Sequence, residues 1–219
     1  MKHSFFRRMM AVLILTWILC AVLPTLSESL QAESSESDWA LMLINRSNPI
    51  PDDYQVGDLV ELRGGQKVDR RIYPDLQAMF DAARADGVYP IVGSGFRTTE
   101  KQQQLMDDKI AAYRAEGHSE EEARRLAESW VAIPGTSEHQ AGICADINAA
   151  GGSGSTNEEV YAWLRDHAHR FGFILRYPED KTDITGTIYE PWHYRYVGIP
   201  AATEIYNGNL CLEEYLSGE

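Results

Sequence analysis

Three short segments of the sequence gather side chains that can bind a metal ion, transfer a proton or hold a negative charge. The first, residues 94–97, reads SGFR and leads toward Gln102. The second, residues 137–146, reads SEHQAGICAD, and the third, residues 190–198, reads EPWHYRYVG. They contain histidines, carboxylates and arginines, the side-chain types from which catalytic metal sites are built.

One zinc site can be assembled from these residues. A catalytic zinc ion takes three nitrogen or oxygen ligands from the protein and keeps a fourth position open for water. His139, Asp146 and His193 supply two imidazoles and one carboxylate. Glu190 lies three residues before His193, and Pro191 between them favours an extended or turned segment over a helix. In such a segment the Glu190 carboxylate can face the water rather than the metal, which is where a general base acts.

Spacing alone leaves an ordinary interpretation open, because the chain has six histidines and 33 acidic residues. Cys144 shares a strand face with Asp146, since side chains alternate along a strand. Thiolates bind zinc well, but a small core residue or a disulfide partner is the simpler interpretation of Cys144. Arg195 shares a face with His193 in the same way, so we expect it to pair with an acid beside the metal.

In this order, the three segments resemble the zinc D-alanyl-D-alanine carboxypeptidases of the VanY type, among the zinc peptidases that cut peptidoglycan stems. The resemblance rests on SGFRT, on the SxHxxGxAxD pattern of SEHQAGICAD and on EPWHYRYVG. It extends more loosely over residues 41–215. It implies one zinc ion per chain, held by His139, Asp146 and His193, with Glu190 as the general base. The implied substrate is a stem peptide that ends in D-Ala-D-Ala.

The resemblance also implies roles for four further residues. Arg97 matches an arginine that faces the scissile carbonyl, where a fixed guanidinium suits developing negative charge; a structural salt bridge is the alternative. Ser137 and Gln102 match contacts to the terminal D-residue of the substrate. Thr99 to Gln102 is also a capping box, which gives Gln102 a different role at a helix start. Tyr177 matches an aromatic residue that lines the cleft, and a packing role is equally consistent.

The same site residues would serve several related activities. An L,D-carboxypeptidase or a peptidoglycan endopeptidase would use them too, because pocket shape rather than the motifs selects the bond. Outside the enzymes, the alternatives are a non-catalytic wall-peptide binding module and a domain that zinc only stabilises. Structural zinc is usually enclosed by four protein ligands, whereas three ligands and a base favour catalysis.

Short strands and helices must position the three segments. Apolar or alternating stretches predict strands at residues 89–93, 143–147, 173–176 and 193–197. Apolar spacing and capping signals predict helices at residues 75–86, from 98 or 99 to about 116, from 119 to just before Pro134, and at 156–172. These elements do not alternate strictly. They predict an α+β fold with a mainly antiparallel sheet flanked by helices and the zinc in a cleft at the sheet. An acidic helical insert, residues 107–134, is expected to cover this cleft.

Composition limits the remaining possibilities. With 219 residues the chain can bury one sizeable core, but has little room for a second full domain. A net charge of −13 makes binding to nucleic-acid phosphates unfavourable, so no nucleic-acid partner is expected.

The N-terminus carries the signs of export. Basic residues precede an uncharged apolar run at residues 9–23, which predicts a signal peptide or an N-terminal membrane anchor over residues 1–32. Residues 33–38 are expected to form a polar tether and residues 39–219 the carboxypeptidase domain. The protein is therefore expected to be extracytoplasmic and cell-wall facing, either secreted or anchored to the membrane. Cys144 and Cys211 could form a disulfide there, and the oligomeric state is left open.

Overall fold

The computed structural model describes residues 39–218, so the predicted signal or anchor and the tether lie outside the described residues. The chain divides after Leu41 into two units. The first is described only at residues 39–41, which form a turn. The second, residues 42–219, holds the predicted catalytic domain. Among the described residues, no helix is long and apolar enough to cross a membrane.

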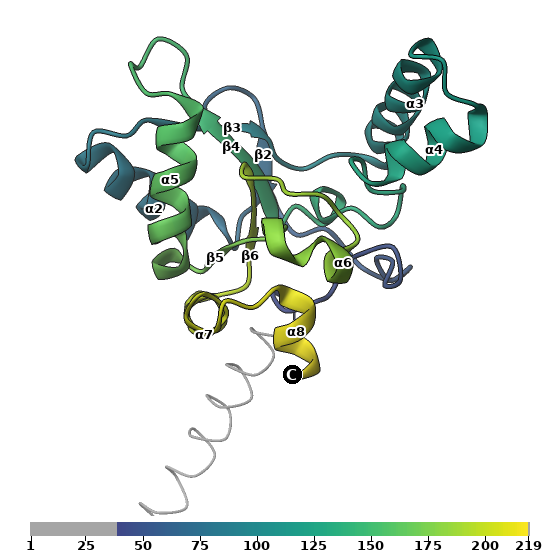
Figure 1. Ribbon diagram of the computed structural model, residues 1–219. Coiled ribbons are helices and arrows are strands. Elements are labelled where there is room, and N and C mark those ends of the chain that lie inside the picture. Colours follow the sequence, from purple (N-terminus) through teal and green to yellow (C-terminus); the bar gives the residue numbers. More distant parts are fainter. Residues whose placement is uncertain (1–38, 219) are drawn as a thin grey trace, which may run out of the picture. The chain divides into compact units, whose positions relative to one another are not determined.

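A four-stranded antiparallel sheet forms the centre of the second unit (Figure 1). Its strands lie in the order β3 (Pro90–Ser94), β4 (Cys144–Ala149), β6 (His193–Tyr196) and β5 (Phe173–Leu175). The four predicted strands are therefore confirmed, each within a residue or two of its predicted bounds. In the register of the two central strands, Asp146 pairs with His193. The expected α+β architecture with an antiparallel sheet is confirmed as well.

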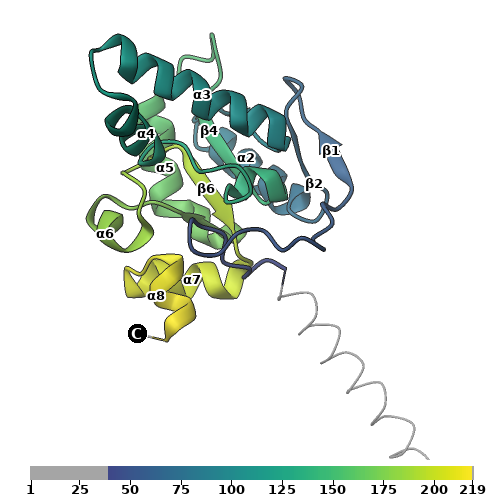
Figure 2. The same ribbon diagram turned by 90° about the vertical axis from the view of Figure 1, so that its right-hand side faces the viewer.

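Helices flank this sheet on several sides (Figures 1 and 2). They are α2 (Tyr73–Ala85), α3 (Thr99–Ala115), α4 (Glu120–Glu128), α5 (Asn157–His167), α6 (Thr182–Thr185), α7 (Ile199–Gly208) and α8 (Leu212–Ser217). Short 3-10 turns are η1 (Glu138–Ala141), η2 (Ala168–Phe171) and η3 (Glu179–Lys181). Helices α2 and α5 pack against β3 and β4, and α7 packs against β5. Helices α3 and α4 pack on each other and project away from the sheet (Figure 1).

Apolar spacing explains how the helices attach. The predicted stripe of α2 (Leu76, Met79, Phe80 and Ala83) is buried, and so is that of α5 (Val160, Trp163 and Leu164). The α3–α4 hairpin has a small core of its own, made by Met106, Ile110, Ala123 and Ala127. The hairpin therefore depends on a few contacts that are separate from those of the sheet.

Two predicted helices differ from the structure at their ends. The helix from Ser119 does not reach Pro134 but stops at Glu128, because the chain after it turns to line a cavity. The Ser119 hydroxyl caps the Glu122 amide as expected, but the Glu122 carboxylate binds Arg125 instead of completing the box. The helix predicted over 156–172 ends at His167, and a 3-10 turn continues it to a left-handed Gly172.

The structure adds elements that the sequence analysis did not predict. A hairpin of β1 (Leu59–Glu61) and β2 (Lys67–Asp69) precedes α2, and α7 and α8 follow the sheet. Cys144 and Cys211 are both buried, and within residues 39–218 both are free thiols, so they do not form the disulfide considered above.

Candidate metal centre and active site

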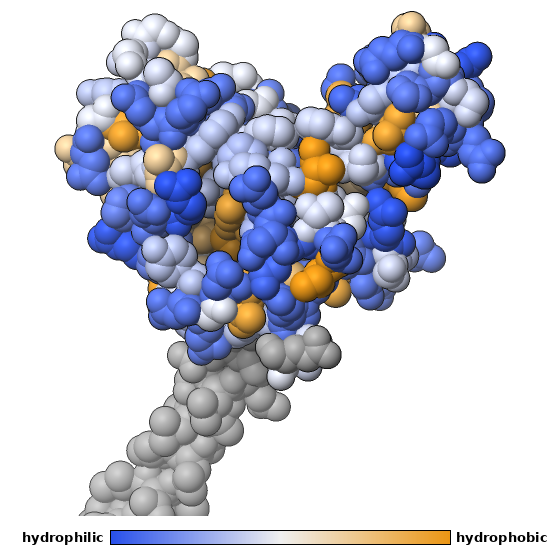
Figure 3. All heavy atoms as spheres, in the orientation of Figure 1, coloured by the Kyte–Doolittle hydropathy of each residue, from blue (hydrophilic) through white to orange (hydrophobic). Residues whose placement is uncertain are grey.

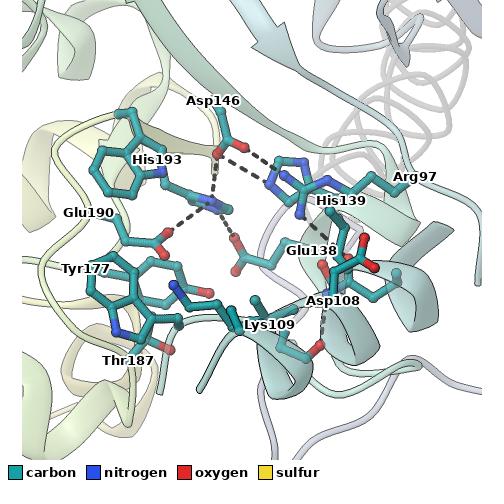
Figure 4. Close-up of a pocket in the computed structure, with 18 residues that line it drawn as sticks. Arg97, Asp108, Lys109, Glu138, His139, Asp146, Tyr177, Thr187, Glu190 and His193 are labelled. Carbon is teal, nitrogen blue, oxygen red and sulfur yellow. Dashed lines mark hydrogen bonds and ion pairs between the residues drawn. The ribbon is translucent and has the colours of Figure 1, made fainter. Parts of the chain in front are cut away.

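Three side chains from different elements converge beside the centre of the sheet (Figure 4). His139 comes from η1, Asp146 from β4 and His193 from β6. Asp146 Oδ1 lies 3.3 Å from His139 Nε2 and 3.2 Å from His193 Nδ1. The pairing of β4 with β6 sets the last two side chains against each other. The structure thus brings the three predicted metal ligands together.

This arrangement fits a tetrahedral metal ion. A zinc ion with ligand bonds of about 2.1 Å separates its ligand atoms by about 3.4 Å, close to the distances from Asp146 Oδ1 to the two ring nitrogens. Asp146 Oδ1 is buried and makes no hydrogen bond to any described residue. Such an orphaned carboxylate oxygen is costly unless a cation satisfies it. Two imidazoles and one carboxylate are also the donor set that a catalytic zinc site uses.

The outer nitrogens of both imidazoles are held by the protein. His139 Nδ1 lies 2.7 Å from the Gly95 carbonyl oxygen, and His193 Nε2 lies 3.2 Å from Glu138 Oε2. Each outer nitrogen therefore donates its proton, which leaves His139 Nε2 and His193 Nδ1 as acceptors for a metal. Gly95 is required in SGFR, because a Cβ at this position would collide with the carbonyl oxygen of Lys67.

Glu138 is a site residue that the sequence analysis missed. It is 1% exposed and accepts hydrogen bonds from His193, from Arg176 Nε at 2.7 Å and from Arg195 Nη1 at 2.8 Å. Burial alone would raise the pKa of Glu138, but the two guanidinium groups hold it well below its usual range. The expectation that Arg195 pairs with an acid beside the metal is confirmed. A sequence signal was present, since Glu138 directly precedes His139.

Glu190 lies beside the three ligands, and its contact with them is to His193 (Figure 4). Its Oε2 atom is 3.6 Å from His193 Nδ1. The expected turn is present, since the His193 amide donates to the Glu190 carbonyl across Pro191. Glu190 is 7% exposed, and this burial raises its pKa to about 7. A carboxylate with that pKa can both accept and release a proton near neutral pH.

Arg97 contacts a predicted metal ligand, Asp146, and also lines the cavity beside it. Its Nη2 atom donates to Asp146 Oδ2 at 2.7 Å, and its Nε atom donates to Ser94 Oγ at 2.9 Å. The salt bridge considered as the alternative is therefore present. The same guanidinium also lines the cavity and has one remaining contact, from Nη1 to Gln102 Oε1 at 3.5 Å.

The remaining predicted residues lie in one cavity of about 420 Å³. Gln102 is buried in its wall and donates from Nε2 to the Ala132 carbonyl at 2.7 Å. The capping-box interpretation of Gln102 is wrong, because Thr98 caps α3 and accepts from the Lys101 amide. Ser137 and Tyr177 line the same cavity, and the Tyr177 ring centre lies 4.9 Å from that of His193.

The helical insert, which the sequence predicted as a cover over the cleft, contributes part of the lining of this cavity. Lining residues from it are Asp108, Lys109 and Ala112 of α3 and Trp130, Val131 and Ala132 after α4, and Leu105 of α3 lines the cavity just before the insert. Cys144 lies behind the ligands, with its sulfur within 4.8 Å of a ring nitrogen of both histidines. All eight residues predicted for catalysis, substrate binding or metal binding therefore border this cavity.

Comparisons with known proteins agree with this geometry. The VanY family model, described as D-alanyl-D-alanine carboxypeptidase, matches residues 65–199. A D-alanyl-D-alanine carboxypeptidase of Enterococcus faecalis is 60% identical over 187 residues, which cover 85% of this chain and 69% of that protein. The chain therefore belongs to the VanY family of D-alanyl-D-alanine carboxypeptidases, which are zinc metallopeptidases.

Two solved structures are similar to the whole described fold. One is a vancomycin resistance D,D-pentapeptidase VanY from a VanB-type cassette, a mutant in complex with Zn(II). It is 61% identical, with a TM-score of 0.79 and coverage of 82% of this chain and 99% of that chain. The other is VanYB in complex with D-alanine-D-alanine, also 61% identical, with a TM-score of 0.81 and coverage of 83% and 99%.

Proposed function

We propose that this protein is a zinc-dependent D,D-carboxypeptidase that removes the terminal D-Ala from peptidoglycan stem peptides ending in D-Ala-D-Ala. The observation that carries the proposal is that ring nitrogens of His139 and His193 converge on the buried Asp146 Oδ1, which has no hydrogen-bond partner among the described residues. Glu190 lies beside them. Membership of the VanY family supports the same reaction.

His139 Nε2, Asp146 Oδ1 and His193 Nδ1 would hold one zinc ion. When bound, such an ion polarises a carbonyl and lowers the pKa of a coordinated water to about 7. Glu138 and the Gly95 carbonyl would keep the two imidazoles in the orientation that binding requires.

Glu190 is proposed as the general base and then the general acid. Its carboxylate would take a proton from the attacking water and pass it to the leaving D-Ala amine. A base that faces the water without binding the metal can do this in both directions. The burial of Glu190 supports the role, because it brings the pKa of the group close to neutral.

Arg97 is proposed to stabilise the negative charge that develops on the scissile carbonyl oxygen. Its contacts with Ser94 and Asp146 fix the guanidinium, and a fixed donor needs little reorganisation during the reaction. Ser137 and Gln102 are proposed to hold the terminal carboxylate of the substrate, and Tyr177 to form part of the cleft wall.

The alternatives are less well supported. An L,D-carboxypeptidase or an endopeptidase would use the same ligands, but the matched family and the D-Ala-D-Ala complex of VanYB favour the D,D reaction. A non-catalytic binding module would not need a buried base beside a zinc site.

We further propose that residues 1–32 direct export as a signal peptide or membrane anchor, that residues 33–38 are a tether, and that residues 39–219 act at the cell wall. The basic start and the apolar run support export. Cell fractionation combined with N-terminal sequencing of the mature chain separates the two forms. A cytosolic full-length chain would contradict both.

Two substrates and a chelator test the reaction. The zinc-loaded protein is incubated with a stem pentapeptide ending in D-Ala-D-Ala and, separately, with the tetrapeptide, and the products are identified by mass spectrometry. Release of one D-Ala from the pentapeptide alone, abolished by the chelator and restored by zinc, is expected. Release from the tetrapeptide would instead indicate an L,D-carboxypeptidase.

A further inference from the structure

A second cavity of about 640 Å³ lies outside the proposed active site. Its walls come from the end of α5, from η2, from β5 and β6, from η3 and from the end of α7. Figure 3 shows a hollow with hydrophobic side chains on its floor, between α5 and α7 as they are placed in Figure 1. None of the residues proposed for catalysis lines this cavity.

The two cavities lie back to back across the chain. Three pairs of sequence neighbours divide between them, with one member in each wall: Tyr177 and Pro178, Glu190 and Tyr189, and His193 and Tyr194. His193 and Tyr194 are neighbours on β6 and therefore point to opposite faces, and in each pair the two Cα atoms are only about 3.8 Å apart. At these three places only the backbone of the chain lies between a molecule in the second cavity and the active site.

Two buried polar atoms of lining residues lack partners. Tyr194 is 1% exposed, and neither its hydroxyl nor His169 Nδ1 has a hydrogen-bond partner in the part of the chain that the structure describes. Buried polar groups are nearly always paired, and leaving one unpaired costs free energy. The wall behind the cavity therefore holds polar atoms that the described part of the protein itself leaves unpaired.

An aromatic platform borders the same cavity. The Tyr206 ring stacks on the His169 ring, with centroids 3.8 Å apart and planes 9° from parallel. Tyr206 is 46% exposed, so part of its ring remains available to a ligand. The exposed residues Asn207 and Asn209 follow it, and their side-chain amides can both donate and accept hydrogen bonds. Aromatic faces beside such amides suit a ligand with apolar C–H faces and polar edges.

The charged residues at the rim of this cavity make polyanionic ligands unfavourable. The lining includes one arginine, Arg165, and three carboxylates, Asp166, Glu179 and Asp180. The potential of this rim is therefore unfavourable for phosphates and other polyanions, including anionic wall polymers. A neutral ligand is compatible with it.

We propose that this second cavity binds an uncharged, N-acetylated saccharide of the peptidoglycan glycan strand. Sugar rings have apolar faces that can pack on Tyr206, and hydroxyl and acetamido groups that can pair with the exposed amides of Asn207 and Asn209. The choice of a peptidoglycan sugar rests on the proposed function, whereas the preference for an uncharged ligand with apolar faces and polar edges follows from the cavity. A stem peptide is attached to such a strand, so a sugar bound here would raise the local concentration of substrate at the active site.

The test measures binding without using turnover. The full chain is titrated with tri-N-acetylchitotriose by calorimetry and by NMR, in the wild type and in Tyr206→Ala, Asn209→Gly and Tyr89→Ala. Asn209 has a left-handed φ of 51°, which glycine adopts readily, so this variant removes the amide without straining the turn. Tyr89 is 41% exposed and lies outside the cavity, which makes it a matched control.

Saturable binding is expected in the wild type and in Tyr89→Ala, with about tenfold weaker binding in Tyr206→Ala and a smaller loss in Asn209→Gly. Glu190→Gln is expected to bind the saccharide normally, so a failure of the proposed catalytic mechanism would not affect this result. Absence of saturable binding to the wild type would overturn the proposal. Equal affinity in all variants, or displacement of the sugar by a stem pentapeptide alone, would overturn it as well.

Discussion

Glu138 connects the proposed metal ligands to the buried core of the protein. One carboxylate oxygen accepts from His193, and the other accepts from Arg176 and Arg195. Both arginines are fully buried, so Glu138 compensates their charges while it orients an imidazole. Removal of this carboxylate should therefore affect the fold and the metal site together.

We predict that Glu138→Gln lowers zinc affinity by about 10- to 100-fold, because His193 loses its charged partner. The free energy of unfolding should fall by about 3–5 kcal/mol, since two buried guanidiniums lose the negative charge that Glu138 supplies, although Arg176 keeps Glu213. Chelator competition and urea denaturation measure the two effects. Glu122→Gln, at an exposed ion pair, is the control and should change neither. Unchanged zinc affinity in a folded Glu138→Gln protein would contradict the orienting role.

Among the secondary-structure elements, the α3–α4 hairpin lines the proposed substrate site and is stabilised by few buried residues. It lines the active-site cavity, yet it is held together by its own small core. We predict that Ile110→Ala destabilises the hairpin locally by about 2–4 kcal/mol, because the change opens a cavity in that core. Faster hydrogen exchange in α3 and α4, with the sheet unchanged, and a raised KM are expected.

Ile184→Ala is the matched control for this prediction, because Ile184 is 47% exposed and lies outside the hairpin core. The control should leave hydrogen exchange in α3 and α4 unaltered. An Ile110→Ala protein whose KM equals that of the wild type would show that the hairpin does not shape the substrate site.

The sequence predicted the elements whose signals are local. Thr156 and Glu159 form the expected capping box, and the alternating residues of β4 and β6 placed Asp146 and His193 on the correct strands. The β1–β2 hairpin was missed, although Gly64 and Gly65 between two alternating stretches are a turn signal.

Other features depend on contacts that no local pattern contains. Helix α4 ends early because the chain beyond it supplies the Ala132 carbonyl to Gln102 of α3. Glu138 was missed for the same reason, since its buried partners Arg176 and Arg195 come from distant parts of the sequence. The metal ligands could be proposed because their types and motif order are themselves distinctive.

Across the whole molecule, Arg176 connects the C-terminal helix α8 to the metal site through ion pairs. Arg176 donates to Glu213 of α8 at 2.7 and 2.8 Å as well as to Glu138. Burial alone would raise the pKa of Glu213, but Arg176 holds it below its usual value. A carboxylate with a lowered pKa stabilises the fold above its unfolded pKa of about 4.3, and this contribution is lost as the pH falls through the folded value.

We therefore predict that Glu213→Gln reduces the fall in stability between about pH 5 and pH 3, and lowers stability at pH 7. Thermal unfolding across this pH range measures the effect. Glu179→Gln changes an exposed carboxylate and should retain the wild-type pH dependence. A Glu213→Gln protein with the same slope as the wild type would contradict the role of this ion pair.

The chemistry proposed for the molecule needs no acyl-enzyme intermediate. We predict that fluorescent penicillin does not label the protein covalently, because β-lactams trap a serine nucleophile and the proposed nucleophile is water. A penicillin-binding serine enzyme, labelled in parallel, is the positive control. A covalent adduct that disappears in Ser137→Ala would replace the metal mechanism with a serine mechanism.

In the proposed mechanism three side chains hold the metal while a fourth, Glu190, moves the proton. The most direct test measures bound zinc and turnover of the stem pentapeptide on the same samples of wild type, Glu190→Gln and His139→Ala. We expect Glu190→Gln to keep one zinc ion per chain and lose about 10²- to 10⁴-fold in kcat, and His139→Ala to lose both zinc and activity. A Glu190→Gln protein that retains wild-type turnover, or that loses its zinc, would contradict the separation of base and ligand.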